Sequence, residues 1–365
     1  MIPVQPFNTF SYIGKNGIEA LPEGTKSLHY LSWEDAVWDV IKYKKIKKGS
    51  IVLIPSFWCN DVVENMRTHG IVCAHYECDQ NFQTDEKILR DAIKKHSPKI
   101  IIIFHAVGIK NNLLAQNRDW VSEIPYDTII IEDSVHSIIN PSEVKILRKN
   151  HFIIDSWRKV MPLQGAAIYG KEEDLFWEKP KVIQSFFNKI TVISFWIIFQ
   201  TLLFLQYISP NIISLFLGKF AERCMILGYD FIGDSKEASG TFNIFAELHS
   251  RLDYENIKRI KREQVLQYEK LMQNVFDSRS DIQQLEYDGS DREELRGFPV
   301  RLDLTHADEI LQNLRSKGLF VRFELNDSPW SQKNKIIFLP LGPHLNSHDI
   351  EKVVEIVKSS IELRH

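Results

Sequence analysis

The sequence predicts an α/β protein built on a mostly parallel β-sheet, with a smaller α+β domain toward its C-terminus. Short apolar runs alternate with amphipathic stretches through the first half of the chain, which is the pattern of βαβ units. The second half changes to long helical stretches around two strand-like runs. At 365 residues, the chain is also longer than one hydrophobic core usually organises.

The first half supplies the strands of the predicted sheet. Each run is four to seven residues long and rich in Ile, Val and Phe, as expected for strands buried on both faces. The runs are IVLIP (51–55), IVCAHY (71–76), KIIIIFH (99–105), TIIIED (128–133), FIID (152–155) and AAIYG (166–170). Between the second and third runs, Ile88, Leu89 and Ile93 fall on one helical face of residues 85–96. We therefore expect helices on both sides of the sheet, in three layers.

The second half predicts a compact smaller domain. A long polar helix is expected over residues 253–275, followed by a strand at 298–304 and a helix at 306–317. A strand at 336–340 and a terminal helix at 347–363 complete the pattern. We expect the large domain to comprise residues 1–250 and the small domain residues 251–365.

Charge and cysteine content exclude several classes of protein. With 45 basic and 48 acidic residues, the formal net charge is −3, so no global positive field attracts nucleic acid. The four cysteines form no CxxC pair and no zinc-type cluster with histidine, so neither a disulfide framework nor a metal site is predicted. The N-terminal stretch lacks the basic start and apolar core of a secretory signal. A cytoplasmic protein is expected.

One apolar segment departs from this picture. Residues 190–217 carry no charge and are long enough to cross a bilayer. A single span would place the C-terminal domain on the other side of the membrane from the rest, and Pro210 divides the segment. We favour helices buried in the core or in a dimer interface. Peripheral membrane contact is the second interpretation.

Candidate reactive residues stand where the apolar runs end, because ligands of parallel sheets bind beyond the carboxyl ends of the strands. Asp133 and His105 each end a run, Asp155 and Ser156 follow another, and Lys159 comes soon after. A lysine and a strand-end carboxylate are what pyridoxal 5'-phosphate (PLP) chemistry requires. The amine forms a Schiff base with the aldehyde, and the carboxylate keeps the pyridine nitrogen protonated.

Two segments resemble the DegT family of sugar aminotransferases, which are fold-type I PLP enzymes. IEDSVHS (131–137) is similar to the family's Glu-Asp-Ala-Ala-Gln segment, which implies that Asp133 pairs with the ring nitrogen and His136 contacts the ring hydroxyl. DSWRKVMPLQGAA (155–167) is similar to Ser-x-Arg-Lys-x-x-Pro-x-x-Gly-Gly/Ala. That likeness implies that Lys159 is the Schiff-base lysine and Ser156 a phosphate ligand. His105 matches no functional residue of the family.

Further segments extend the resemblance over most of the chain. KKGSIVLIPSFWCNDVVENMRTHGI (47–71) resembles a stretch in which an aromatic residue after the proline stacks on the cofactor ring, which implies Trp58, with Phe57 as the alternative. SKEASGT (235–241) loosely resembles a region that contacts the neighbouring subunit. The family implies amination of a nucleotide-linked keto-sugar for surface polysaccharides, glutamate as amino donor, and a homodimer.

Plain structural roles remain open for these residues. Asp133 could cap the segment that follows it, and Trp58 could simply be buried in the core. His136 replaces a glutamine of the family, and a histidine near a sheet edge is more often structural than catalytic.

The phosphate-binding turn departs from the family pattern. Where the family has Ser-Gly-Thr-Ala or Ser-Gly-Arg-x-Ala at a helix N-terminus, this chain has SWEDA (32–36). Ser32 is retained as a candidate ligand, but Trp33 replaces the glycine, and Glu34 and Asp35 add negative charge near a dianion. Either Ser156 and nearby N–H groups hold the phosphate, or PLP binding is weak or lost. In the second case the protein would be a non-catalytic scaffold at a membrane-associated pathway.

Overall fold

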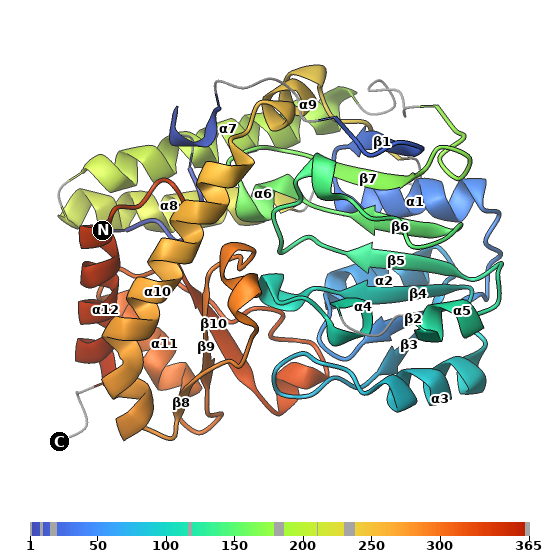
Figure 1. Ribbon diagram of the computed structural model, residues 1–365. Coiled ribbons are helices and arrows are strands. Elements are labelled where there is room, and N and C mark those ends of the chain that lie inside the picture. The colour runs from blue at the N-terminus through green and yellow to red at the C-terminus, as the bar shows by residue number, and fades with distance from the viewer. Residues whose placement is uncertain are drawn as a thin grey trace.

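The computed structural model describes residues 2–7, 10–14, 20–115, 119–178, 186–209, 211–229 and 238–361. Figure 1 shows two sheets side by side, with the larger one formed by the first half of the chain. Its strands are β1 (Thr25–Tyr30), β2 (Ile51–Pro55), β3 (Val72–Tyr76), β4 (Ile100–Phe104), β5 (Ile129–Asp133), β6 (His151–Ile154) and β7 (Ala166–Lys171). All six apolar runs therefore form strands, and the alternation that predicted an α/β fold is confirmed.

The large sheet is mostly parallel. Its strand order is β1-β7-β6-β5-β4-β2-β3, and β2 through β6 pair in parallel. Only β7 runs the other way, since it pairs antiparallel with both β1 and β6. The helices of this part are α1 (Trp33–Tyr43), α2 (Asn60–Thr68), α3 (Glu86–His96), α4 (Asn112–Ala115), α5 (Asp119–Glu123) and α6 (Trp157–Val160).

Successive residues of the central strands pack into two separate cores, which makes the sheet the middle of three layers. In β5, Ile129 and Ile131 join the core that contains α1 and α2 residues such as Val37 and Met66. Ile130 faces the opposite core, where α3 contributes Leu89. This alternation is the period of two of a strand. It decides on which face each strand-end side chain lies.

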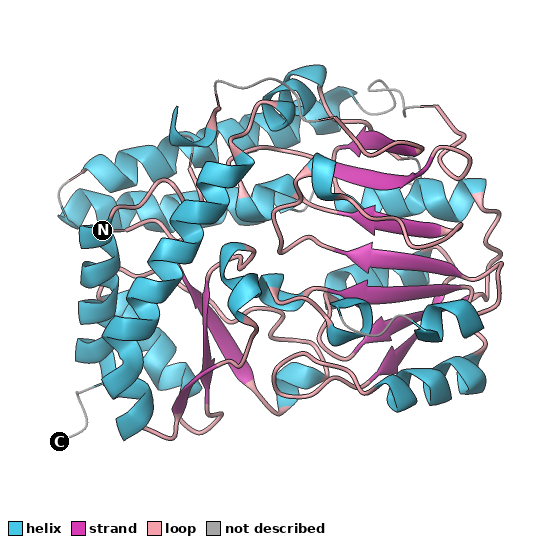
Figure 2. Ribbon diagram, in the orientation of Figure 1, coloured by secondary structure: helices cyan, strands magenta, loops and turns pink. Residues whose placement is uncertain are grey.

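The second sheet is small and antiparallel, with order β10-β9-β8. It comprises β8 (Ile282–Gln284), β9 (Phe298–Leu302) and β10 (Lys335–Leu339), and is accompanied by α10 (Tyr254–Ser278), α11 (Ala307–Ser316) and α12 (Ser347–Ile361). Figure 2 shows α10 lying over this sheet and reaching back toward the large one. The expected smaller α+β part is thus present, while the division after residue 250 stays a prediction.

The apolar segment forms two helices, α7 (Phe186–Ile208) and α8 (Asn211–Tyr229), which pack against each other. Residue 210 lies outside the described residues. In the most apolar stretch, Ile190–Ile208, 22% of the residues are buried in the chain. Burial in the core of the chain, one of the two expected forms of burial, is therefore wrong for this stretch, whereas burial in a dimer interface stays a prediction. A short helix, α9 (Asn243–Ser250), follows.

A close backbone contact joins the two parts next to the end of β4. The Arg296 N–H donates to the Val107 carbonyl oxygen at 2.8 Å, and Gly108 beside it has φ +90°. A Cβ atom on Gly108 would lie 2.4 Å from the Glu294 carbonyl oxygen. Only glycine combines this φ with such a close approach.

We expect Gly108→Ala to lower the free energy of unfolding by more than the roughly 1–3 kcal/mol typical of backbone strain alone. Gly49→Ala is the matched control, because Gly49 has φ +82° with nothing near its Cβ position. Urea denaturation followed by circular dichroism measures both variants. Equal losses would show that the contact between Gly108 and residue 294 contributes nothing.

Candidate functional site

A cleft opens where the carboxyl ends of β5 and β6 face the small sheet. It has a volume of about 420 Å³, and its lining includes Asp133, Ser156, Lys159, Trp58 and residues 322–327. Asp133 ends β5 on the face of Ile131 and therefore on the side that α1 and α2 cover. Lys159 lies in α6, just after β6. The two residues singled out from the sequence thus meet in one cleft.

Asp133 is almost completely buried and holds two hydrogen bonds. Its Oδ2 accepts from the Trp58 indole N–H at 2.8 Å, and its Oδ1 accepts from the Val135 N–H at 3.2 Å. Burial raises the pKa of Asp133 to about 6, although the Trp58 hydrogen bond and the positive charge of Lys159 oppose the shift. The charge of Lys159 therefore acts on the Asp133 carboxylate within the same cleft. The hydrogen bond from Val135 shows that Asp133 also caps the segment that follows it, which is the structural role that the sequence left open.

The turn that carries Lys159 is fastened to the sheet by Asp155. The Asp155 carboxylate accepts from the Ala167 N–H at 2.6 Å and from the Trp157 indole at 3.2 Å. Burial raises the pKa of Asp155 to about 7. The Trp157 N–H also donates to the Gly165 carbonyl oxygen at 2.9 Å. Asp155 therefore positions the segment and does not line the cleft.

His136 lies behind Lys159 and is completely buried. Its Nδ1 accepts from the Val107 N–H at 3.1 Å, and its Nε2 lies 3.0 Å from Arg296 Nη1. Nε2 lies 3.3 Å from Glu324 Oε1 and 3.5 Å from Lys159 Nζ. Burial and the charge of Lys159 lower the pKa of His136 to about 3, so the ring is neutral near pH 7. His136 contacts Lys159 without being among the residues that line the cleft.

Two charged residues beside Lys159 were not found from the sequence. Arg296 Nη1 donates to Glu324 Oε1 at 2.6 Å, and both side chains are buried. Arg296 also lies over the Phe338 ring. Arg296 and Glu324 come from the small-sheet region and form an ion pair against His136 only after the chain has folded. Neither had a distinguishing local motif.

Phe57 and Trp58, the two aromatic residues that follow β2, make different contacts. Both side chains belong to the core, and Trp58 is only 3% exposed. Phe57 stacks on Phe82 with ring centroids 4.4 Å apart. Trp58 lines the cleft and meets Trp33 edge to face, with centroids 5.5 Å apart. Its indole N–H donates to Asp133. The stacking role expected for Trp58 stays a prediction.

The SWEDA turn forms the N-terminus of α1 at the cleft. Ser32 is its N-cap, and its hydroxyl both accepts from the Asp35 N–H and donates to Asp35 Oδ2 at 2.7 Å. Asp35 Oδ1 accepts from the Ser239 N–H at 2.8 Å. Trp33 and Glu34, but not Ser32, are among the lining residues. The hydroxyl of Ser32 is thus occupied within the turn, and its role as a phosphate ligand stays a prediction.

Ser156 is better placed for that role. It precedes α6, its side chain does not cap the helix, and it lines the cleft together with Arg158. Of the SKEASGT segment, residues 235–237 lie outside the described residues. Ser239 contacts α1, and Thr241 Oγ1 donates to the Gln164 carbonyl oxygen at 3.2 Å.

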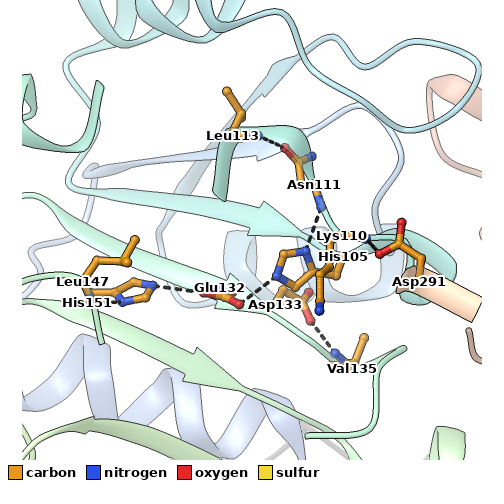
Figure 3. Close-up of polar contacts among 10 residues, drawn as sticks. All are labelled: His105, Lys110, Asn111, Leu113, Glu132, Asp133, Val135, Leu147, His151 and Asp291. Atoms are coloured by element: carbon orange, nitrogen blue, oxygen red, sulfur yellow. Dashed lines mark hydrogen bonds and ion pairs between the residues drawn. The ribbon is translucent and has the colours of Figure 1, made fainter. Parts of the chain in front are cut away.

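The neighbouring strand-end residues belong to a separate network on the opposite face of the sheet (Figure 3). Glu132 precedes Asp133 in β5 and therefore points the other way. Its two oxygens lie 2.8 Å from His105 Nε2 and 3.4 Å from His151 Nε2. Each histidine accepts a backbone N–H at Nδ1, from Asn111 and Leu147 respectively.

This network is structural. Because Nδ1 is an acceptor in both rings, each Nε2 carries a proton that can be donated to Glu132. These bonds hold the pKa of Glu132 well below its usual range despite burial. The network ties the carboxyl ends of β4 and β5 to His151, the first residue of β6. Because it lies on the opposite face of the sheet, His105 has no place in the cleft.

Comparison with solved structures identifies the fold. The chain superimposes on Spr1654 from Streptococcus pneumoniae, assigned as a sugar aminotransferase and solved in its PLP form, with a TM-score of 0.61, 15% identity and 98% of each chain covered. DesV from S. venezuelae, solved with a ketimine intermediate, has a TM-score of 0.60 at 14% identity, covering 92% of this chain and 85% of that one.

A third solved structure agrees with these. The aminotransferase TlmJ from Streptoalloteichus hindustanus has a TM-score of 0.61 at 13% identity, with 99% of each chain covered. No protein-family model and no curated protein sequence matches the chain. At such low identities the likeness establishes the fold, the one expected from the resemblance, while the activity has to be argued from the residues of the cleft.

The raised pKa of Asp133 predicts a pH-dependent cost to folding. The folded pKa of about 6 lies above the ordinary 3.8, so the contribution to stability is complete below pH 3.8 and is lost as the pH rises through 6. Between pH 5 and pH 8 this loss amounts to about 1 kcal/mol. Asp133→Asn should remove it, so that the free energy of unfolding falls less over this range than in the wild type.

Urea denaturation at both pH values, without added cofactor, tests this expectation. Comparing the change with pH, and not the absolute stability, cancels any effect of the amide on packing. The same slope in both proteins would mean that Asp133 is already ionised at pH 5.

Proposed function

We propose that the protein is a PLP-dependent aminotransferase of the DegT type that aminates a nucleotide-linked keto-sugar in surface polysaccharide biosynthesis. The observation that carries this proposal is the convergence of Lys159 and Asp133 in one cleft, on a fold shared with solved aminotransferases. The keto-sugar, glutamate as amino donor and the homodimer rest on the family resemblance, and the cytoplasmic location rests on the cysteine pattern.

The residues of the cleft fit the reacting end of the cofactor. Asp133 is buried at a strand end beside Lys159, and its carboxylate keeps acceptor capacity. Each carboxylate oxygen has two lone pairs, so the Trp58 N–H leaves room on Oδ2 for a second donor. A pyridinium N–H could therefore share this oxygen with Trp58.

When bound, PLP supplies an aldehyde for the lysine amine and a ring that takes up electrons from the substrate. The protein's own groups would do the rest. Asp133 would hold the proton on the pyridine nitrogen, and Lys159 Nζ would move a proton at the reacting carbon. Neutral His136 and the Arg296–Glu324 pair would limit where the Lys159 side chain can lie.

The phosphate end has a mixed charge. Ser156, Arg158 and the N-terminus of α1 favour an anion, whereas the Glu34 carboxylate opposes it. This supports the second candidate function, a weakly PLP-binding or non-catalytic scaffold. The Trp58 bond to Asp133 also suits that alternative, because it satisfies the carboxylate without a cofactor.

Replacing Lys159 by Ala separates the two candidates. We expect the purified wild type to be yellow after incubation with PLP, and borohydride reduction to fix the cofactor mass on the peptide that contains Lys159. Lys159→Ala should show neither signal, whereas Lys171→Ala, at the end of β7, should keep both. A wild type that stays colourless and unlabelled would favour the scaffold.

Removing the charge of Glu34 tests where the phosphate lies. If the phosphate rests near the α1 N-terminus, Glu34→Gln should relieve a repulsion of about 1 kcal/mol and tighten PLP binding by about fivefold. Glu64→Gln on α2 is the control, since Glu64 is exposed and does not line the cleft. Fluorescence titration with PLP gives both affinities. Unchanged affinity in Glu34→Gln would place the phosphate at Ser156 and away from this turn.

A further inference from the structure

The outward face of α7 and α8 is an apolar surface in contact with solvent. Six exposed side chains define it, which we call the α7–α8 face: Ile197, Phe204, Ile208, Ile212, Ile213 and Phe216. Ile212 is 87% exposed and Phe216 is 70% exposed, so these residues contribute little to the core of the chain. Apolar side chains gathered in this way need a partner to remove them from water.

The inward face of the same helices is fixed to the body of the protein. Phe199, Leu203 and Ala221 pack with Phe7 in a core of their own. Tyr207 donates to Asp349 of α12 at 3.1 Å, and Glu222 pairs with Arg315 of α11 at 2.7 Å. Figure 1 shows both helices lying along the molecule and not projecting from it. The α7 helix is apolar and long enough to span a bilayer, but these contacts leave it lying against folded protein.

The charges at the edge of the face are positive. No charged residue occurs between positions 190 and 218, and the next cations, Lys219 and Arg223, are both exposed on α8. Glu222 is the only carboxylate residue in the sequences of the two helices, and Arg315 neutralises it. An apolar face bordered by cations is the pattern of helices that lie in the interface of an anionic membrane.

We propose that the α7–α8 face docks in the plane of an anionic lipid surface, with its apolar side chains between the headgroups and Lys219 and Arg223 on lipid phosphates. A second copy of the chain fits less well. In a two-fold dimer the face would meet itself, and no carboxylate of these helices would be available to the two cations. A lipid surface provides both the apolar phase and the negative charge.

Docking in this way would bring the membrane beside the cleft. Ile226 of α8 lines the cleft that contains Lys159. Phe199 and Leu203 of α7 and Met225 of α8 share a smaller cavity of about 70 Å³ with the same lysine. The helices that contact lipid on one side would therefore contact the candidate site on the other. This inference stands independently of whether the cleft binds PLP.

Vesicle flotation of the full-length protein tests the proposal. We expect the wild type to float with phosphatidylcholine vesicles that contain phosphatidylglycerol and to float poorly with phosphatidylcholine alone. Phe216→Glu should weaken the partition by at least about tenfold, because an aromatic side chain that the lipid would bury is lost and a charge is added. The matched control is Tyr126→Glu, since Tyr126 is aromatic, 66% exposed and lies before β5. Thermal melts establish that each variant is folded.

A second variant tests whether the two cations bind the anionic lipid. Lys219→Gln combined with Arg223→Gln should abolish the preference for phosphatidylglycerol and retain weak binding to both vesicle types. Wild-type protein that floats with neither type would overturn the proposal. So would a soluble dimer that Phe216→Glu converts to a monomer, because the face would then belong to a second copy. Equal flotation with both vesicle types would refute the anionic lipid.

Discussion

The structure of the cleft depends on a buried carboxylate next to an amine. Asp133 sits at the end of a parallel strand, almost without solvent, and burial alone would favour its protonated form. Lys159 partly offsets this cost through its charge, and the Trp58 indole does so through a hydrogen bond of 2.8 Å. The rest of the site can be understood as the means of holding them there. Asp155 fixes the turn of Lys159, and the Arg296–Glu324 pair closes the side toward the small sheet.

The period of a β-strand separates two polar systems that are neighbours in the chain. Glu132 and Asp133 are adjacent in β5, yet one faces a pair of histidines and the other faces the cleft. Because Glu132 contacts His105 at 2.8 Å and lies 3.4 Å from His151 Nε2 on its own side, its charge stays within the network that joins β4, β5 and β6. This arrangement keeps the strand ends in register, and the position of Asp133 relies on that register.

The small-sheet region and the helical pair α7–α8 complete the site from outside the large sheet. Gly108 permits the backbone approach of residues 294–296, and that approach brings Arg296 against His136. The α7–α8 helices cover the other side of Lys159 while keeping an apolar surface outward. The same two helices therefore connect the candidate site with the proposed contact to lipid.

The sequence by itself determined the α/β class, because strands buried on both faces leave continuous apolar runs and helices leave a period near 3.6. It also singled out Lys159, Asp133 and Ser156, since strand ends and a short local motif are visible in the order of residues. Other features came only with the tertiary structure. Residues that meet across large sequence separations, such as Arg296 and Glu324 at His136, carry no local signal, because their pairing energy exists only after folding brings them together. Competition for hydrogen-bond partners within the folded chain decided that Ser32 bonds to Asp35 and that Trp58 bonds to Asp133. Packing decided that α7 and α8 keep an apolar face outward.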